Sequence, residues 1–500
     1  MINRRHSVDN RAKIAYNQGE KRNTARSRRA AARSMEVLMQ PIDIILIVYG
    51  AAALFAALLY IPKLVQFLHC FFPPARRFAR EKRRIALLIP ARDESRVIGD
   101  LFDSILRQTY DRENFEVNVI VKRADDPTVE MAKKLGFSVF VVPEQTCKGA
   151  ALDGFFQRIG KEHWQDCAAY CIVDADAVLA PDYVEQLNNA LDMDAHIYLS
   201  RKRIKNYLGD RKSRSIFCNC SALNYPLLDD MGNYYRMKKG TPLNMCGQGM
   251  MVRSDAIEKI GGWPYRSLTE DYEMKMDSFL QDFKSVYYPY AVIYTEEAVK
   301  HSEAWKRRLR WVMGFTQCDH KYKQRVQRAM REKKYPFFAW YDTFFGIVPP
   351  VIFIVATMLA SLAGIVLTCV YAAMGSILWV KALLLLVLMP PLLMYLFDLL
   401  YNALTMYIYR DAYAVLSGGE KAATLLFSPL FMFEYFPIFL HAHLYLLAGK
   451  DLGWAHTARL TYRKGAAAEK AELFYRTTIK KLFIKRRKER APEEENTVKE

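Results

Sequence analysis

Two acidic motifs near the middle of the chain contain residues that could bind a metal ion and accept a proton. Asp174 and Asp176 follow the apolar run 170–173. A turn at the end of that strand would let a carboxylate meet a divalent cation, which could bridge substrate phosphates and stabilise a departing diphosphate. An Asp-x-Asp triplet occurs by chance about once in a chain of this length, so a solvated turn explains this one equally well when it is taken alone.

The second acidic motif, Thr269-Glu270-Asp271, opens a segment with a helical pattern. A carboxylate at this place could act as the general base for an acceptor hydroxyl. A helix N-terminus also favours Thr as its cap and acidic residues in its first turn. The structural and the catalytic interpretations are compatible, and the sequence supports both.

A basic aromatic run, 305–311 (WKRRLRW), follows about thirty residues later. Arg310 could bind a diphosphate and Trp311 could stack on a sugar ring. The alternative is an amphipathic helix beside a membrane, whose Arg and Lys side chains bind lipid phosphates.

The elements that would position these motifs alternate between short β-branched runs and helical patterns over residues 84–330. This alternation favours a parallel sheet with crossover helices. The expected strands are Ile85–Ile89, Val117–Val121, Ser138–Val142 and Ala169–Val173, and the clearest expected helices are Arg96–Arg107 and Thr128–Leu135.

Long apolar segments flank this region on both sides. Residues 42–68 are long enough to cross a bilayer once, and three more blocks follow the α/β region at Thr343–Tyr371, Ile377–Tyr409 and Ala422–Leu447. The paired prolines at 349–350 and 390–391 predict kinks in the first two of these blocks.

Three polar residues interrupt the later blocks. Asp398 either faces the path of a polymer or lies near the membrane interface. His441 and His443 are expected to pack at the interface rather than to hold a metal ion. The nine cysteines are scattered without a CxxC pair, which predicts reduced thiols rather than a disulfide framework.

The charge pattern bears on the side of the membrane that each part occupies. The net charge of +19 is concentrated at both termini and beside the apolar blocks, which favours an anionic membrane surface over nucleic acid. The basic cluster 76–84 predicts a cytoplasmic domain after the first span. Residues 1–34 are equally basic and would prefer the same side, a conflict that translation from Met35 would remove. Three C-terminal spans would leave the basic tail outside, so one block is expected to be re-entrant or to cross twice.

Taken in order, the motifs resemble those of the family 2 membrane glycosyltransferases, which include cellulose, chitin, hyaluronan and poly-N-acetylglucosamine synthases. The resemblance covers residues 84–315. It rests on Ile89-Pro-Ala-Arg-Asp-Glu94, Lys148-Gly-Ala-Ala-Leu152, Asp174-Ala-Asp176, Gly247-Gln-Gly249 with Gly261-Gly-Trp263, Thr269-Glu-Asp271 and Arg310-Trp311.

The resemblance implies an α/β GT-A domain, Rossmann-like with a mostly parallel sheet, and flanking transmembrane helices. It implies that Asp271, beside Glu270, is the catalytic base and that Asp176, with Asp174, binds Mg²⁺ or Mn²⁺. The implied substrate-binding residues are Pro90, Ala91, Arg92, Glu94, Lys148, Asp174, Gln248, Arg310 and Trp311.

The activity implied is inverting transfer of a hexosyl or N-acetylhexosaminyl group from a nucleotide sugar, a UDP-sugar by expectation, onto a glycan or lipid-linked acceptor. The product would be a polysaccharide exported across the plasma membrane by a multi-pass protein with a cytoplasmic catalytic domain, alone or with an accessory export protein. Membrane lipids are expected partners, and nucleic acid is not. The expected parts are a disordered arm 1–34, a transmembrane helix 42–69, the GT-A domain 80–330, transmembrane or interfacial helices 336–448 and a basic cytoplasmic tail 449–500.

Two positions depart from the family pattern. Arg307 stands where the processive members carry Gln, which weakens the expectation of processivity. Lys122 stands where an Asp that binds uracil is usual, with Asp125 and Asp126 shortly after it. A non-processive transferase and a polyprenyl-phosphate sugar transferase are the alternatives, and a non-enzymatic membrane scaffold is a third.

Overall fold

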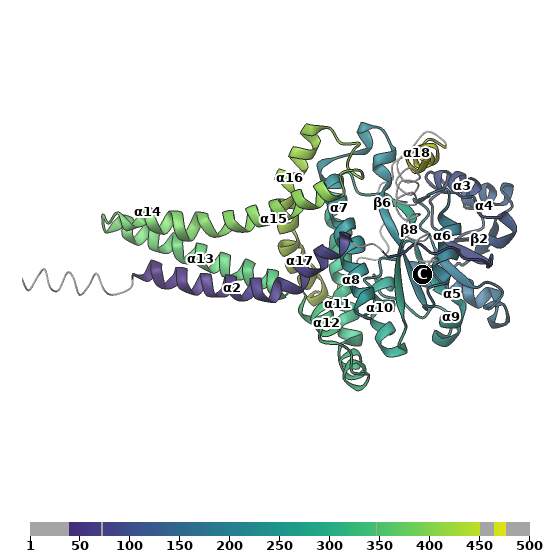
Figure 1. Ribbon diagram of the computed structural model, residues 1–500, viewed down its shortest axis with the longest axis horizontal. Coiled ribbons are helices and arrows are strands. Elements are labelled where there is room, and N and C mark those ends of the chain that lie inside the picture. Colours follow the sequence, from purple (N-terminus) through teal and green to yellow (C-terminus); the bar gives the residue numbers. More distant parts are fainter. Residues whose placement is uncertain (1–39, 72–73, 347, 451–464, 477–500) are drawn as a thin grey trace, which may run out of the picture. The chain divides into compact units, whose positions relative to one another are not determined.

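The computed structural model describes residues 40–71, 74–346, 348–450 and 465–476 (Figure 1). The predicted disordered arm, residues 1–34, and most of the predicted tail, residues 449–500, lie outside this part. The chain forms two compact units, Met1–Tyr60 with Ile347–Met394, and Ile61–Gly346 with Tyr395–Glu500.

An eight-stranded sheet forms the centre of the larger unit, in the order β3-β2-β1-β4-β7-β6-β8-β5. The strands span Ile85–Ala91 (β1), Phe115–Val121 (β2), Ser138–Val141 (β3), Ala169–Ile172 (β4), Val178–Leu179 (β5), Ile197–Ile204 (β6), Met250–Arg253 (β7) and Ser285–Thr295 (β8). Pairs β1–β2, β2–β3, β1–β4 and β6–β8 are parallel.

The sheet is mixed and mostly parallel, which confirms the predicted mostly parallel sheet. β7 runs antiparallel to both β4 and β6, and β5 runs antiparallel to β8. The long connection between β6 and β7 carries several short helices, so β7 enters the sheet from the opposite end. The first four predicted strands are confirmed to within two residues at each end.

Both faces of the sheet are buried because successive side chains of a strand point to opposite sides. In β1, Leu87 and Ile89 belong to one buried cluster, and Ala86 and Leu88 belong to the other. The first cluster is completed by α3 (Ile98–Leu106), α4 (Pro127–Lys134) and α6 (Tyr183–Leu191), and the second by α5 (Lys148–Ile159), α9 (Ser254–Ile260) and α10 (Glu270–Gln281). Figure 1 shows α3 and α4 on one side of the strands and α5 and α9 on the other.

A second group of helices completes this unit. It contains α7 (Ile216–Pro226), the π-helix η6 (Leu227–Asn233), α8 (Tyr234–Lys238), α11 (His301–Glu332), α12 (Phe337–Trp340), the π-helix η7 (Tyr341–Phe345), α16 (Gly418–Phe433), α17 (Tyr435–Leu447) and α18 (Ala466–Phe474).

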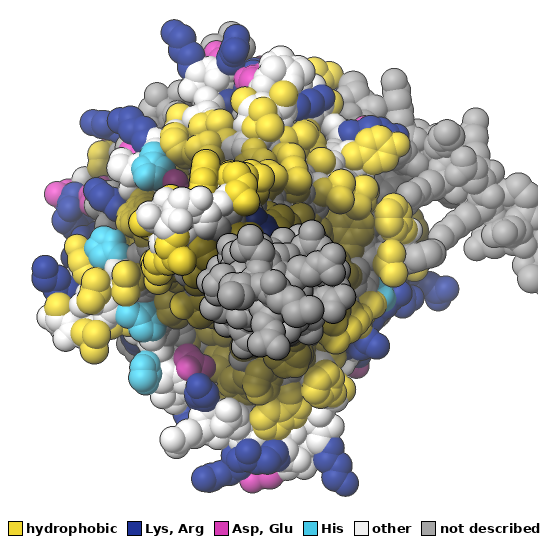
Figure 2. Space-filling model, turned by 90° about the vertical axis from the view of Figure 1, so that its left-hand side faces the viewer, with side chains coloured by type: hydrophobic (Ala, Val, Ile, Leu, Met, Phe, Trp, Pro, Cys, Tyr) yellow, Lys and Arg dark blue, Asp and Glu magenta, His cyan; other side chains and the backbone are white. Residues whose placement is uncertain are grey.

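Four helices of the described chain are long and apolar enough to cross a membrane: Pro41–Leu68 (α2), Val348–Ala373 (α13), Leu378–Ile408 and Gly418–Leu447. The third comprises α14 (Leu378–Ala382), the π-helix η8 (Leu383–Leu388) and α15 (Met389–Ile408). Side chains of the hydrophobic type gather on the face shown in Figure 2, with many Lys and Arg side chains toward its edge. The composition and length of these helices identify a membrane protein.

The two proline pairs have different surroundings. Pro349 and Pro350 lie in the first turn of α13, where the missing N–H costs no helical hydrogen bond, so no kink is expected there. Pro390 and Pro391 open α15 directly after η8, where the regular helical hydrogen bonding changes. In the smaller unit, Lys381 donates to Asp43 over 2.6 Å.

A buried group of ions lies within the larger unit around Asp342, whose side chain is 1% exposed. Asp342 accepts two hydrogen bonds of 2.7 Å from Arg236, and Lys63 and Lys275 lie 3.2 and 3.8 Å away. Burial alone would raise the pKa of Asp342, but the three cations outweigh it and hold that pKa well below its usual range. One carboxylate is therefore the shared partner of three positive side chains.

We expect Asp342→Ala to lower the free energy of unfolding by about 3 to 5 kcal/mol, because removal of one partner leaves buried charges uncompensated. The measurement is the thermal unfolding midpoint of the detergent-purified protein. Asp319→Ala removes an exposed carboxylate of α11 and serves as the matched control. An equal midpoint for the two variants would contradict this account of the cluster.

Candidate active site

The Asp-x-Asp motif lies in the turn that follows β4, at the carboxyl end of the strand. Asp174 is half-buried and Asp176 is buried. The backbone N–H of Ala177 donates to the Asp174 carbonyl over 3.0 Å and closes the turn. A parallel α/β sheet places its ligand sites at this edge.

The antiparallel strand β7 brings a second loop to the same edge. Ile172, the last residue of β4, pairs with Met250, the first residue of β7. The Gly249 N–H donates to the Ile172 carbonyl over 2.9 Å. The loop 244–249 therefore lies beside Asp174, because β7 runs antiparallel to β4.

Lys148, Glu270 and Asp271 meet at this loop. The Lys148 ammonium, at the first residue of α5, donates to Asp174 over 2.6 Å and lies 3.6 Å from a Glu270 oxygen. A Cβ placed on Gly247 would lie 3.1 Å from both the Asp271 carboxylate and the Lys148 ammonium. Gly247, at φ +61°, thus brings backbone directly against the two charged groups.

Burial and the neighbouring Glu270 raise the pKa of Asp271 to about 7, and Lys148 acts in the opposite direction. A carboxylate that ionises close to neutral pH is suited to accept and release a proton. The raised pKa of Asp271 is compatible with the predicted role of this residue as general base.

Gly149 makes the approach of α5 to the 265–270 segment possible. A Cβ on Gly149 would lie 1.9 Å from the Tyr265 carbonyl oxygen, and backbone cannot yield as a side chain can. The neighbouring Lys148 reaches Asp174 and Glu270 only while this contact is kept.

We expect Gly149→Ala to destabilise the domain by about 1 to 3 kcal/mol and to displace Lys148, because it overpacks a backbone contact. Gly99→Ala in α3 is the matched control, since its nearest neighbour would be the Met131 side chain at 3.9 Å. Thermal unfolding and sugar transfer are measured on both. A Gly149→Ala protein as stable and active as the control would contradict the proposed packing.

α11 supplies the two residues of the basic aromatic run. The Arg310 guanidinium donates to the Leu268 carbonyl over 3.0 Å, directly before the Thr269-Glu270-Asp271 motif, and its charge lowers the pKa of Asp271. Trp311 is half-buried on the same helix. Arg307, on the same helix, has different partners. Its guanidinium contacts the Glu296 carbonyl and the Glu297 carboxylate, each at 3.0 Å.

The segment 90–94, which contains four of the predicted substrate-binding residues, lies at the end of β1 and at the same edge of the sheet. Pro90 and Ala91 are buried in β1, and Arg92 and Glu94 are half-buried in the turn after it. Asp126, near the predicted base-binding position, caps α4 and accepts hydrogen bonds from the N–H groups of Asp93 and Thr128. Its part in this turn is structural.

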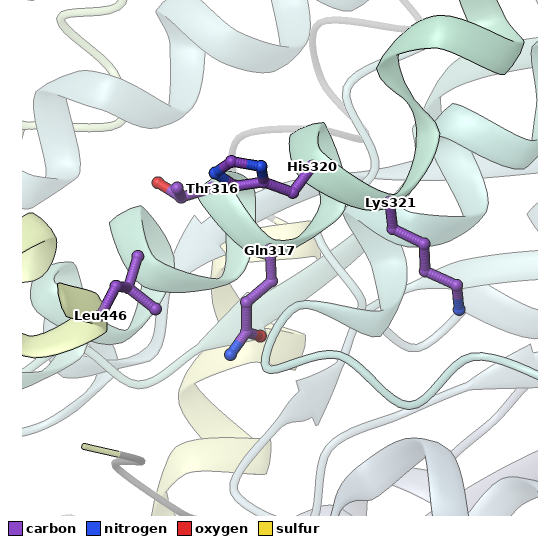
Figure 3. A pocket seen from close by; sticks show the side chains of 5 residues that line it. All are labelled: Thr316, Gln317, His320, Lys321 and Leu446. Atoms are coloured by element: carbon purple, nitrogen blue, oxygen red, sulfur yellow. The ribbon is translucent and has the colours of Figure 1, made fainter. Parts of the chain in front are cut away.

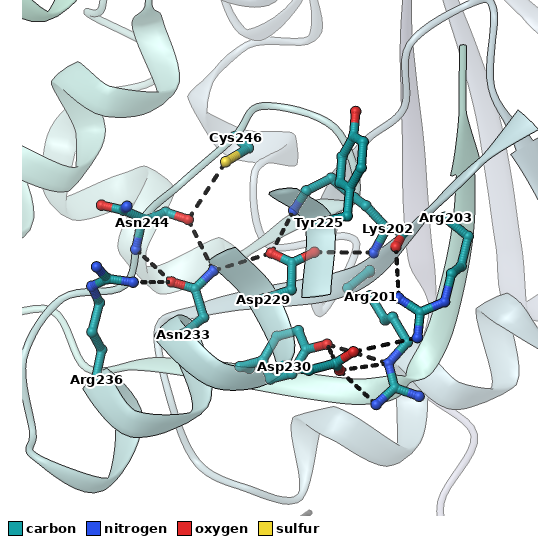
Figure 4. Close-up of polar contacts among 12 residues, drawn as sticks. Arg201, Lys202, Arg203, Tyr225, Asp229, Asp230, Asn233, Arg236, Asn244 and Cys246 are labelled. Carbon is teal, nitrogen blue, oxygen red and sulfur yellow. Dashed lines mark hydrogen bonds and ion pairs between the residues drawn. The ribbon is translucent and has the colours of Figure 1, made fainter. Parts of the chain in front are cut away.

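A polar network that includes Asn233 holds the loop 244–249 in place (Figure 4). Asn233, at the end of η6, accepts from the Asn244 N–H over 2.8 Å and donates to the Asn244 carbonyl over 3.1 Å. Asp229 accepts from Lys202 over 3.0 Å, and Asp230 accepts from Arg201 over 2.8 Å. The sequence signal was present, since Arg201-Lys-Arg203 and Asp229-Asp230 are charged runs within a buried domain.

Gln248 and Trp263, which belong to the paired motifs 247–249 and 261–263, have different environments. Gln248 is 6% exposed, and its side-chain Nε2 has no hydrogen-bond partner among the described residues. A buried donor of this kind is costly unless a ligand or water satisfies it. Trp263 is 1% exposed and packs edge-on against Tyr265, so it belongs to the core rather than to an acceptor site.

The donor set at Asp174 and Asp176 fits a hard divalent cation, because carboxylate oxygens are the ligands that Mg²⁺ and Mn²⁺ prefer. Over residues 40–71, 74–346, 348–450 and 465–476, no group of three or more His, Cys, Asp or Glu side chains is arranged to hold a metal ion. An ion at Asp174 and Asp176 would therefore need further oxygen ligands from the substrate.

A separate open pocket lies on α11 and α17, between Thr316, Gln317, His320, Lys321 and Leu446 (Figure 3). The Gln317 side chain accepts from the Leu268 N–H over 3.3 Å, and Lys321 donates to Glu273 over 2.5 Å. These contacts support the segment before the acidic pair. The sequence-predicted site residues do not line this pocket.

Comparison with known proteins now decides the family. Residues 171–415 match the family model for glycosyl transferase family group 2. This chain carries a family 2 glycosyltransferase domain. The matched residues include the acidic motifs and α11, and the fold around them is the GT-A fold that the sequence predicted.

Two curated relatives are similar over about half of the chain. A probable glycosyltransferase, YdaM, from Bacillus subtilis (strain 168) is 25% identical over 55% of this chain and 67% of its own length. A poly-β-1,6-N-acetyl-D-glucosamine synthase from Staphylococcus aureus (strain COL) is 24% identical over 47% of this chain and 55% of its own length. The chain thus spans about half to two thirds of the length of these relatives.

A solved structure shares the fold. The mannosyltransferase PcManGT from Pyrobaculum calidifontis, in complex with GDP-Man and Mn²⁺, superposes with a TM-score of 0.51. The match covers 82% of this chain and all of that chain, at 18% identity. This likeness concerns the fold alone.

Proposed function

We propose that this family 2 glycosyltransferase is an inverting enzyme that extends a polysaccharide with hexosyl or N-acetylhexosaminyl groups from a UDP-sugar. The observation that carries the proposal is the meeting of Lys148, Asp174, Glu270 and Asp271 against the backbone of Gly247. A carboxylate with a pKa of about 7 lies there beside positive groups, which is what proton abstraction next to a departing diphosphate requires.

In the proposed reaction, the Asp271 carboxylate takes the proton of an acceptor hydroxyl. The resulting oxygen forms a bond to the anomeric carbon of the donor sugar from the face opposite the diphosphate. The bond between that carbon and the diphosphate oxygen breaks, and the leaving group keeps the electron pair. A single displacement of this kind inverts the anomeric configuration.

The chain's own residues hold the reactants in this scheme. Lys148 and Arg310 offset charge on the diphosphate, and Trp311 stacks on the acceptor. The buried amide of Gln248 donates to the acceptor, and the turn at Arg92 and Glu94 holds the nucleotide. Asp176, with Asp174, would hold Mg²⁺ or Mn²⁺, which supplies further charge stabilisation at the diphosphate when bound.

The proposal places the catalytic domain on the cytoplasmic side of the plasma membrane, where nucleotide sugars are made, with the product exported by this protein or with an accessory protein. A second candidate, addition of a single sugar to a lipid-linked glycan, is favoured by one observation. Arg307, at the position where processive members carry Gln, is held by Glu296 and Glu297.

The test is sugar transfer by the detergent-purified full chain, with radiolabelled UDP-glucose, UDP-N-acetylglucosamine, UDP-glucuronate and GDP-mannose, each with Mn²⁺ or Mg²⁺. We expect one UDP-sugar to give a product of high molecular weight on a gel. Label confined to short products or to the lipid fraction would favour the second candidate. Incorporation from GDP-mannose alone would contradict the proposed donor class.

A further inference from the structure

The strand that follows the Asp-x-Asp motif is short and lies at the edge of the sheet. β5 contains two residues, Val178 and Leu179, and it pairs with β8 alone in the strand order. Asp176 stands two positions before this strand. A strand of two residues makes few backbone hydrogen bonds to its neighbour, so side-chain packing must help to hold β5 and the turn before it in place.

The two faces of β5 are covered by different parts of the chain. The Leu179 side chain belongs to the main core, and its N–H donates to the Ser104 hydroxyl of α3 over 3.1 Å. Val178 and Ala180 face the other way, because successive side chains of a strand alternate. They belong to a small buried cluster of their own, whose other members are Leu208, Val292, Tyr294, Ala467 and Ala471.

The C-terminal helix α18 supplies the last two members of that cluster. Ala467 and Ala471 are four residues apart, so they lie on the same face of α18, and both are buried. A large or charged side chain at either position would have to displace the helix, because protein interiors are close-packed. α18 therefore buries the face of β5 that points away from the main core.

Polar contacts hold α18 in the same place, beside α3 (Figure 1). The Tyr475 hydroxyl, directly after α18, donates to the buried Asp182 carboxylate over 2.7 Å, and Gln186 donates to the same carboxylate over 2.9 Å. Arg107, at the end of α3, lies 3.1 Å from Glu472 of α18. The C-terminal helix is thus bound to β5 and also to the segment that leads from β5 into α6.

We propose, on the basis of the metal-binding role proposed above for Asp174 and Asp176, that α18 is a positioning element for the metal site. By packing on β5 it fixes the turn that holds these two carboxylates, and so it raises the affinity for Mg²⁺ or Mn²⁺. Ala467, Ala471 and Tyr475 act through β5 and α6 rather than by contact with the ion. Residues that support metal ligands in this way commonly change metal affinity by about 10- to 100-fold when they are mutated.

The proposal adds the C-terminal part of the chain to the catalytic apparatus. α18 begins at Ala466, whereas the match to the family model ends at residue 415. The metal site of this chain would therefore depend on a segment that the family match does not include.

The test is Mn²⁺ binding by the detergent-purified full chain, measured as the loss of the electron paramagnetic resonance signal of free Mn²⁺. UDP and, in parallel, GDP are present, and each nucleotide without protein gives the background. Ala471→Glu places a charge in the buried cluster and should weaken Mn²⁺ binding by about tenfold or more. Leu473→Glu, the matched control, adds the same charge at a side chain of α18 that is 61% exposed and should bind Mn²⁺ as the native protein does.

Two further variants separate positioning from a loss of folding, which the thermal unfolding midpoint monitors. Ala471→Ser keeps a small side chain and should retain native Mn²⁺ affinity. Tyr475→Phe removes one hydrogen bond to Asp182 and should weaken Mn²⁺ binding by about threefold. It replaces Ala471→Glu if that protein does not fold.

Native Mn²⁺ affinity in folded Ala471→Glu, or in Tyr475→Phe in its place, would overturn the proposal. Equal losses in Ala471→Glu and Leu473→Glu would also overturn it, because the effect would then not come from the buried face of α18. Native protein that binds no Mn²⁺ with either nucleotide would contradict the proposed metal site itself, and this inference with it. The readout needs no sugar transfer, so the two kinds of failure are distinguishable.

Discussion

Asp271→Asn is expected to lower the turnover of sugar transfer by about 1,000-fold, because it keeps the shape of the side chain and removes the general base. Donor binding should change little, since the groups proposed to hold the diphosphate are Lys148 and Arg310. The measurement is incorporation of radiolabelled sugar at saturating donor. Asp319→Asn, an exposed position on α11, is the matched control and should retain full activity.

The same residue predicts the pH dependence of transfer. Burial and Glu270 raise the pKa of Asp271 to about 7, so the active carboxylate form is lost as the pH falls through that value. The kcat/KM of the native enzyme is therefore expected to decline about tenfold per pH unit below pH 7 and to level off above it. Activity that stays constant from pH 8 to pH 5 would contradict the assignment of Asp271 as base.

Lys148→Met is expected to lower kcat/KM by about 100-fold or more, because one cation near the developing charge is removed from a water-poor site. The ammonium lies between Asp174 and Glu270 and also holds down the pKa of Asp271. Its loss should therefore move the acidic limb of the pH profile to higher pH. This displacement separates an electrostatic role from a purely structural one.

Lys134→Met is the matched control for Lys148→Met, since Lys134 is an exposed lysine of α4 whose partner is Glu130. It should change neither kcat/KM nor the pH profile. A Lys148→Met enzyme with reduced activity but an unmoved acidic limb would show that Lys148 does not set the pKa of Asp271.

Much of the site could be predicted because its residues lie at the ends of regular elements. Asp174 follows a buried strand, and Lys148 and Glu270 open helices. Arg310 lies in the basic aromatic run on a helix that precedes an apolar block. Such positions can be read from local patterns of apolar residues and caps. The order of these motifs then indicated the family, which the comparison confirmed.

The remaining features depend on contacts between distant segments, which no local pattern specifies. The antiparallel insertion of β7 is one, and it places Gly247 against Asp271. The Asp342 ion cluster joins residues as distant as Lys63 and Asp342, and its members form no recognisable sequence motif. The docking of α18 on β5 is another, because small alanine contacts carry no strong sequence signal.

The residues around Asp342 and Asn233 also support the loop 244–249. Arg236 binds Asp342 on one side and Asn233 on the other, and Asn233 holds both backbone polar groups of Asn244. Ion pairs and hydrogen bonds of this kind are strong when buried and fully satisfied. The loop that carries Gln248 is therefore supported by a continuous polar network.

The central claim, that this site transfers sugar from a nucleotide donor by way of Asp271, is tested most directly by the stoichiometry of turnover. The full chain is reconstituted in lipid vesicles, and nucleoside diphosphate release and sugar incorporation are measured together. The account predicts one diphosphate released for each sugar incorporated, with both rates about 1,000-fold lower in a folded Asp271→Asn protein. Equal release and incorporation by Asp271→Asn and the native protein would contradict it.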